Sequence, residues 1–197
     1  MSHADDSIVV VVLAAGGGSR YRGPTHKLDA DLNGRPVLAH AVDAALASGV
    51  GPVVIVTADH VTTALPPDVE RVVNHRWQDG QMSSLRLGIE TAAKRGATSV
   101  VVGLGDQPFV RPDAWTLVAN TDAPIAVATY DGRRGQPVKL RHDVWAALPA
   151  DGDEGARALM RLRPDLVVEV PCEGSPTDVD TLEDLRRWQN NSSTSSP

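Results

Sequence analysis

The chain has 197 residues, of which 42% are hydrophobic and 22% are charged, a composition typical of one globular domain with a substantial core. A formal net charge of −6 argues against a surface for nucleic acid or acidic lipid, and no apolar run reaches the length of a membrane span. A single cysteine, Cys172, excludes an internal disulfide, and the polar segment 1–7 is unlike a signal peptide, so we expect a cytoplasmic protein.

The first half of the chain alternates segments that predict strands with segments that predict helices. Continuous β-branched runs are typical of strands buried on both faces of a parallel sheet, and they occur at residues 8–12, 53–56 and 99–102, with a weaker strand predicted at 69–73. Apolar residues at helical spacing, followed by a glycine, predict helices from Pro36 to Gly49 and from Met82 to Gly96. This alternation favours an α/β protein.

The second half continues the alternation less regularly. It predicts a helix at 112–120, antiparallel strands at 125–129 and 136–140, a helix at 155–162 and a strand at 166–170. Thr181 to Asp184 resembles a capping box that begins a last helix. We predict one domain, 8–189, between a flexible segment 1–7 and a disordered tail 190–197. The expected fold is a three-layer α/β/α sandwich with a mainly parallel, Rossmann-like sheet, whose ligands bind beyond the carboxyl ends of the strands.

Three consecutive glycines, Gly16 to Gly18, directly follow the first predicted strand. Glycines allow backbone N–H groups to turn toward an anion and surround it. Arg20, Arg22 and Lys27 follow in a chain that is acidic overall, which favours a phosphate-binding loop over a plain tight turn. The segment lacks the Gly-Lys-Ser/Thr of a Walker loop and the G-x-G-x-x-G spacing of a dinucleotide site.

Two acidic segments are candidates for a divalent metal. Asp106 follows a predicted strand and lies between Gly105 and Pro108, where a turn aspartate and a metal ligand are equally plausible on residue type alone. Asp178 and Asp180 precede the last helix, a position at which acidic residues also stabilise the helix start.

The order of these motifs resembles that of the MobA-like nucleotidyltransferases. Leu13 to Gly16, Arg20, Gly23 and Lys27 resemble the family signature L-A-A-G-x-x-x-R-x-x-G-x-x-K, although Tyr21-Arg22-Gly23 is one residue longer than the usual Met-Gly and three residues separate Gly23 from Lys27. The resemblance implies a nucleotide-diphospho-sugar transferase-like fold in which this loop wraps the phosphates of an NTP. The residues that would contact the phosphates are Leu13, Ala14, Ala15, Gly16, Gly17, Gly18, Ser19, Arg20 and Lys27.

Further motifs carry the resemblance from residue 9 to residue 188. Gly105 to Pro108 matches the family's G-D-Q-P motif, and 178–185 resembles D-I-D-T-P-E-D-L with Leu182 in place of proline. By this resemblance Asp106 and Asp180 hold Mg²⁺, and Asp106 is catalytic together with Arg20 and Lys27. The segment 74–85 is similar to the N-x-x-W-x-x-G-M-S-x-S-L segment of the molybdenum-cofactor cytidylyltransferases, which implies base or ribose contacts from Asn74, Gly80 and Ser83.

The same resemblance implies an acceptor site. Gly135 to Pro137 looks like the family's G-x-P strand, and 152–157 looks like its G-D-x-G-A-R loop, although a plain Asp–Arg surface pair is an equal alternative for the latter. The implied acceptor-binding residues are Gln107, Gly135, Pro137, Asp153 and Arg157. His26 and Trp77, by contrast, are predicted to be a solvated loop residue and a core residue.

The implied function is Mg²⁺-dependent transfer of a nucleotidyl group from an NTP, best CTP, to a phosphorylated acceptor, best molybdopterin. A molybdoenzyme or its maturation chaperone would be a protein partner, and no nucleic acid or membrane is expected. One alternative is guanylyl or cytidylyl transfer to another phosphorylated small molecule. A second is a non-catalytic protein of the same fold that binds or escorts the molybdenum cofactor; retention of Asp106 and Asp180 argues against it.

Overall fold

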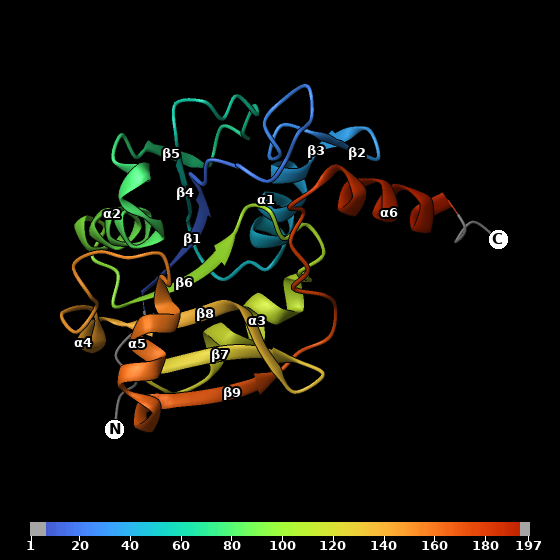
Figure 1. Ribbon diagram of the computed structural model, residues 1–197. Coiled ribbons are helices and arrows are strands. Elements are labelled where there is room, and N and C mark those ends of the chain that lie inside the picture. Colours follow the sequence, from blue (N-terminus) through green and yellow to red (C-terminus); the bar gives the residue numbers. More distant parts are fainter. Residues whose placement is uncertain (1–6, 194–197) are drawn as a thin grey trace.

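A seven-stranded sheet forms the centre of the computed structural model, which describes residues 7–193 (Figure 1). Its strand order is β5-β4-β1-β6-β8-β7-β9. The strands are β1 (Ile8–Ala14), β4 (Val53–Thr57), β5 (Glu70–Val73), β6 (Ser99–Leu104), β7 (Ile125–Tyr130), β8 (Arg133–Arg141) and β9 (Val167–Pro171). β8 pairs antiparallel with β6 and β7, whereas the other neighbouring strands pair in parallel. The predicted strand positions and the antiparallel return are confirmed.

The valine run of β1 lies in the middle of the parallel half of the sheet. Val10 is paired with Val53 of β4 on one side and with Val101 of β6 on the other. Val10, Val11 and Val12 are completely buried, because helices cover both faces of the sheet. The run is continuously apolar since neither face of this strand meets water.

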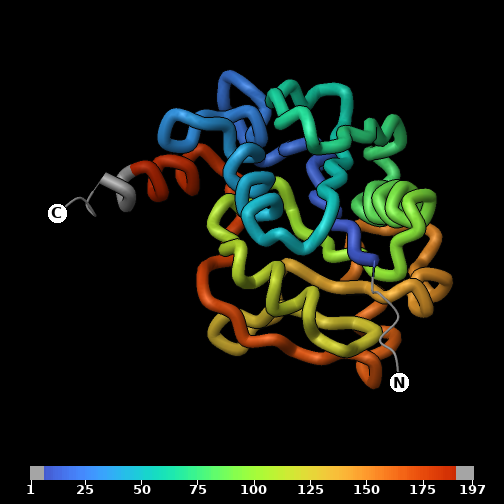
Figure 2. Tube along the Cα trace, turned by 180° about the vertical axis from the view of Figure 1, so that it is seen from behind, coloured from blue at the N-terminus to red at the C-terminus, as the bar shows by residue number. Residues whose placement is uncertain are grey.

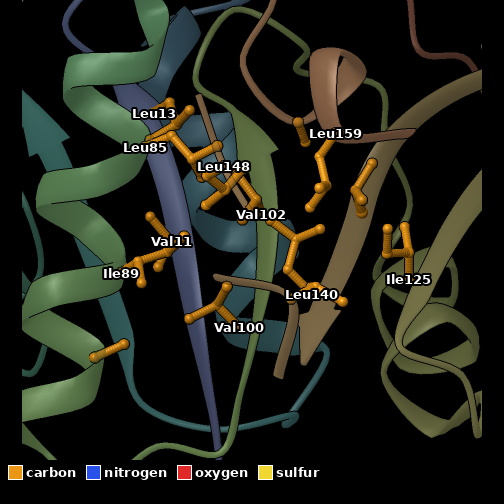
Figure 3. Packing of buried hydrophobic residues seen from close by; sticks show 14 of the residues in the cluster. Val11, Leu13, Leu85, Ile89, Val100, Val102, Ile125, Leu140, Leu148 and Leu159 are labelled. Carbon is orange, nitrogen blue, oxygen red and sulfur yellow. The ribbon is translucent and has the colours of Figure 1, made fainter. Parts of the chain in front are cut away.

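Helices cover the sheet on two sides, as Figures 1 and 2 show from opposite directions. Val11 and Leu13 belong to a core with α2 (Gln81–Lys94), where Figure 3 shows them near Leu85 and Ile89, and with the short helices α4 (His142–Trp145) and α5 (Ala156–Leu162). Residues of opposite orientation, such as Val10, pack with α1 (Val37–Ala47) and α3 (Pro112–Asn120). The predicted three-layer α/β/α sandwich is confirmed.

The last helix, α6 (Leu182–Ser193), leaves the body of the protein beside a small hairpin of β2 (Asp31–Leu32) and β3 (Arg35–Pro36) (Figure 1). Thr181 and Asp184 form the predicted capping box: the Asp184 N–H donates to Thr181 Oγ1 and the Thr181 N–H donates to Asp184 Oδ2. α6 continues to Ser193, so the boundary predicted at residue 190 was too early. Residues 1–6 and 194–197 of the predicted flexible ends lie outside the described residues.

The sequence did not predict five of the short elements, namely β2, β3, α4 and the 3₁₀ turns η1 (Trp77–Asp79) and η2 (Pro164–Leu166). Such segments are too short to show a hydrophobic period. Between residues 7 and 193, no helix combines the length and apolar character needed to cross a membrane.

Candidate active site

A cleft of about 340 Å³ opens at the carboxyl edge of the sheet. The loop after β1 contributes Gly16 and Gly17, and the loop after β6 contributes Asp106. β1 and β6 are neighbours, so both loops emerge at the same place. This is where parallel α/β sheets bind their ligands.

A charged network ties together four of the predicted site residues. Lys27 Nζ donates to Asp106 Oδ2 at 2.6 Å and to Asp180 Oδ1 at 2.9 Å. Asp180 Oδ2 also lies 2.8 Å from Arg20 Nη2. The Val179 N–H donates to the Asp106 carbonyl oxygen at 2.8 Å, which fastens the segment before α6 to the end of β6. Residues up to 160 positions apart in sequence therefore meet at one point.

Burial and charge act in opposite directions on Lys27. Burial disfavours the ammonium, but the carboxylates of Asp106 and Asp180 outweigh it and raise the pKa of Lys27. The stabilisation from this charge is therefore complete at neutral pH and is lost only as the pH rises through the raised pKa.

Asp178 is the third carboxylate of the group. Burial, followed by the charge of Asp106, raises its pKa, although a 2.6 Å hydrogen bond from Gln107 Nε2 partly opposes the shift. The free energy of unfolding consequently falls as the pH rises from the pKa of Asp178 in the unfolded chain to its raised pKa in the folded protein. Above that raised pKa, the ionised carboxylate destabilises the fold.

The carboxylates of Asp106 and Asp180 fit a divalent cation. One oxygen of each lies within 2.9 Å of the same Lys27 nitrogen, so both face a common point. In residues 7–193 no group of three or more His, Cys, Asp or Glu side chains is arranged to hold a metal. Two hard oxygen donors suit Mg²⁺, which takes its other ligands from water and phosphate, better than zinc, which prefers a closed set of protein ligands.

The wall of the cleft facing the glycine loop comes from η1 and the start of α2. Trp77, predicted to be a core residue, lines the cleft and packs on Gly17: a Cβ at Gly17 would lie 2.6 Å from its ring. Asp153 lines the same cleft, although the resemblance places it at the acceptor. No sequence pattern indicates that residues 17, 77 and 153 are neighbours, because they lie on three segments that are far apart in the chain.

Gly80 allows this wall to form, and its replacement by alanine is expected to lower the free energy of unfolding by about 3 kcal/mol. Its φ is 97°, and a Cβ would lie 2.7 Å from the Gly152 carbonyl oxygen and 2.6 Å from Asp153 Oδ1. Gly96→Ala is the matched control, because Gly96 has a φ of 77° with nothing within 4 Å; we expect a loss of about 1 kcal/mol there. Urea unfolding measures both values. Equal losses would show that the contact with Gly152 is unimportant.

Asn74 and Ser83 lie behind this wall. Asn74 Nδ2 donates to the hydroxyl oxygens of Ser83 and Ser84, and the Ser83 hydroxyl donates to the Gly80 carbonyl oxygen. Both residues line a neighbouring hollow of about 240 Å³, whereas Ser84 lines the cleft. The base contacts implied for Asn74 and Ser83 remain predictions. The hydrogen bonds from Asn74 to Ser83 and from Ser83 to the Gly80 carbonyl oxygen stabilise the turn that contains Gly80.

A second pocket, of about 350 Å³, lies between the start of β8 and α5. Because β8 runs antiparallel, its first residues lie at the carboxyl edge of the parallel strands, on the same side as the cleft. Gly135 and Arg157, two of the implied acceptor residues, line this pocket together with Arg134 and Arg161. Gln136 is buried beside them, and its Oε1 accepts no hydrogen bond from any described residue. Gln107 lies elsewhere, bonded to Asp178.

Comparison with known proteins agrees with this geometry. The family model for the MobA-like NTP transferase domain matches residues 10–169. Nicotine blue oxidoreductase from Paenarthrobacter nicotinovorans is 34% identical over 183 residues, covering 84% of this chain and 88% of that protein. Purine catabolism protein PucB from Bacillus subtilis (strain 168) is 30% identical over 183 residues, covering 85% and 89%.

The fold has close counterparts among solved structures. Rv0371c from Mycobacterium tuberculosis H37Rv superposes with a TM-score of 0.81 at 27% identity, over 95% of this chain and all of that one. The same protein has been solved in complex with manganese, with a TM-score of 0.77 at 25% identity, over 93% of this chain and 98% of that one. The family model covers most of the chain, and the glycine loop and both acidic motifs lie where the sheet binds ligands, so the chain belongs to the MobA-like NTP transferase family.

Proposed function

We propose that this protein transfers a cytidylyl group from CTP to a phosphorylated acceptor of the molybdopterin type, with Mg²⁺ as cofactor and pyrophosphate as the second product. The observation that carries the proposal is the convergence of Arg20, Lys27, Asp106 and Asp180 beside the glycine loop. Two cations and two carboxylates at the edge of a glycine loop suit a triphosphate with a bound divalent ion. Family membership supports nucleotidyl transfer as the reaction class.

The reaction requires positioning and charge stabilisation more than covalent chemistry. An oxygen of the acceptor phosphate attacks the α-phosphorus, the bond to the bridging oxygen breaks, and pyrophosphate leaves with that electron pair. Arg20 and Lys27 neutralise the charge that moves onto the leaving phosphates, and the glycine N–H groups donate to their oxygens. Asp106 and Asp180 would hold Mg²⁺, which supplies further positive charge to the triphosphate. The manganese complex of Rv0371c supports a divalent ion on this fold.

The choice of CTP draws support from Asp153. This exposed carboxylate lines the cleft, and no hydrogen bond or ion pair engages it among the described residues. A carboxylate accepts from the exocyclic amino group of cytosine, which uracil lacks. We therefore expect CTP to bind more tightly than UTP.

The choice of acceptor draws support from the second pocket. Arg157 lacks an ion-pair partner among residues 7–193 and provides positive charge for a phosphate, whereas Arg134 pairs with Glu169 and Arg161 pairs with Glu154. The buried Oε1 of Gln136 offers an acceptor for a ring N–H. A phosphorylated pterin carries both groups. Delivery of the product to a molybdoenzyme or its chaperone remains a prediction.

Calorimetric titration with CTP, UTP, GTP and ATP, each with and without Mg²⁺, tests the proposal. We expect binding that depends on Mg²⁺ and favours CTP over UTP by about tenfold, the ratio that one hydrogen bond to a charged group provides. Preference for GTP would assign the protein to guanylyl transfer. Failure of every nucleotide to bind would refute the proposed function and the roles given to Arg20 and Lys27.

A further inference from the structure

Two histidines converge on one carbonyl oxygen of the glycine loop. His26 Nε2 lies 3.1 Å and His60 Nε2 lies 3.4 Å from the oxygen of Gly16. His26 belongs to the segment that precedes Lys27, and His60 follows β4, so the two come from separate loops. Their ring centroids are 4.5 Å apart. His26 lies in a loop, as predicted, but it is half-buried and held against the Gly16 carbonyl instead of being fully solvated.

The hydrogen bonds of His26 define which of its nitrogens carries the proton. The Leu28 N–H donates to His26 Nδ1 at 3.3 Å, so Nδ1 holds the lone pair and Nε2 carries the hydrogen. His26 is thus a donor to the Gly16 oxygen and not a metal ligand through Nε2. Burial, then the charges of His60 and Lys27, lowers the pKa of His26 against the opposing effects of the Gly16 carbonyl and Asp29. The neutral donor form is therefore the one present at neutral pH.

Holding the Gly16 carbonyl also sets the direction of the next N–H group. The peptide bond between Gly16 and Gly17 is planar, and its C=O and N–H point in opposite directions. Gly16 and Gly17 line the cleft, whereas the two histidines do not. The Gly17 N–H is therefore directed away from the two histidines.

Aromatic rings enclose the rest of the loop. Trp77 packs on Gly17 and meets the His60 ring edge-on, with centroids 5.0 Å apart. His26 fills the space beside Gly18, where a Cβ would lie 2.9 Å from its Nε2. The three rings come from three segments and touch the loop at successive glycines, which leaves its backbone little freedom.

We propose that His26 and His60 are positioning residues that hold the Gly16 carbonyl and so aim the Gly17 N–H at the phosphates of the bound NTP. This inference rests on the proposed function, because the phosphates are those of its donor substrate. The two histidines therefore influence binding of the polyphosphate chain of the NTP. Binding of the nucleoside part does not depend on them. A loop held in its binding conformation before the ligand arrives avoids the entropy cost of ordering it.

The test compares His26→Phe and His60→Phe with the wild-type protein in calorimetric titrations of CTP with Mg²⁺ and of cytidine. We expect each variant to weaken CTP binding about tenfold and to leave cytidine binding unchanged, because each loses one hydrogen bond at the phosphate loop. His26→Gln retains an N–H in place of Nε2 and should restore most of the CTP affinity. His75→Gln is the matched control, since His75 pairs with Asp59 on the exposed surface.

A second measurement separates this inference from the proposed function. The NMR order parameter of the Gly17 amide should be about 0.85 in the free wild-type protein and fall toward 0.6 in both phenylalanine variants. If no NTP binds the wild type, the proposed function fails. The order parameter still tests whether His26 and His60 hold the glycine loop. An unchanged Gly17 amide, or an equal loss of CTP and cytidine affinity, would overturn the inference.

Discussion

Asp106→Asn is expected to lower the rate of pyrophosphate release by about 10³-fold and to leave the fold intact. Asp106 lies at the end of β6, outside the hydrophobic core, and its side chain is 20% exposed. The substitution keeps the shape of the side chain and removes the charge that would hold Mg²⁺ with Asp180. Lys27 still has Asp180 as a partner, so the ammonium is not left unpaired. Pyrophosphate release and circular dichroism measure the two effects.

Asp178→Asn is the matched control for this experiment. Asp178 lies in the same acidic group but accepts its hydrogen bond from Gln107 instead of Lys27. We expect this variant to keep most of the activity, because the asparagine oxygen can accept the same bond. Comparable activity of Asp106→Asn and the wild type would refute the metal assignment. Equal losses of activity in both variants would instead show that the total negative charge of Asp106, Asp178 and Asp180 determines the rate.

Lys27→Met is expected to have the second large effect, a loss of about 3 kcal/mol of stability in the absence of metal. The Lys27 side chain is only 10% exposed, and its removal leaves Asp106 without its counter-ion and Asp180 with the exposed Arg20 alone. Mg²⁺ should restore much of this loss in the variant, since the cation takes over the role of the ammonium. The wild type should respond less to Mg²⁺. The same variant should also bind CTP more weakly, because it lacks a phosphate contact.

Urea unfolding with and without Mg²⁺ measures this difference. Arg20→Met serves as the control: Arg20 also pairs with Asp180 but is 75% exposed, so water screens the pair and its loss costs little. An equal response to Mg²⁺ in the wild type and in Lys27→Met would show that these carboxylates do not bind the ion.

Much of the fold could be predicted because its signals are local. The run 8–12 reads as a buried strand without knowledge of its neighbours, and β1 indeed pairs on both sides. Thr181 and Asp184 are three residues apart, so their capping box was visible in the sequence and is confirmed. The meeting of Asp106 and Asp180 could not be predicted from local signals alone. Its prediction combined the position of Asp106 at the end of a strand with the family resemblance.

The missed features depend on contacts between distant loops. His26 and His60 meet only because the loops after β1 and β4 lie side by side, and no spacing in the sequence encodes that meeting. Trp77 resembled a core residue because tryptophan is usually buried, and only the folded chain shows its ring against Gly17. Asp153 lines the cleft instead of the second pocket, which we call the arginine pocket after Arg134, Arg157 and Arg161, because its loop folds back onto the start of α2.

The reversed direction of β8 has a consequence for how this protein family can diversify. The glycine loop and Asp106 precede β8, whereas the arginine pocket is built from residues 134–164. Under the proposed function, substitutions at residues 134–136 and 157–164 would therefore alter the molecule that receives the nucleotide with little effect on the triphosphate, whereas Asp153, between these two segments, lines the cleft itself. Under the proposed function, such a division would let natural selection exchange the acceptor while the nucleotide stays the same. We expect relatives of this chain to differ most in the lining of the arginine pocket.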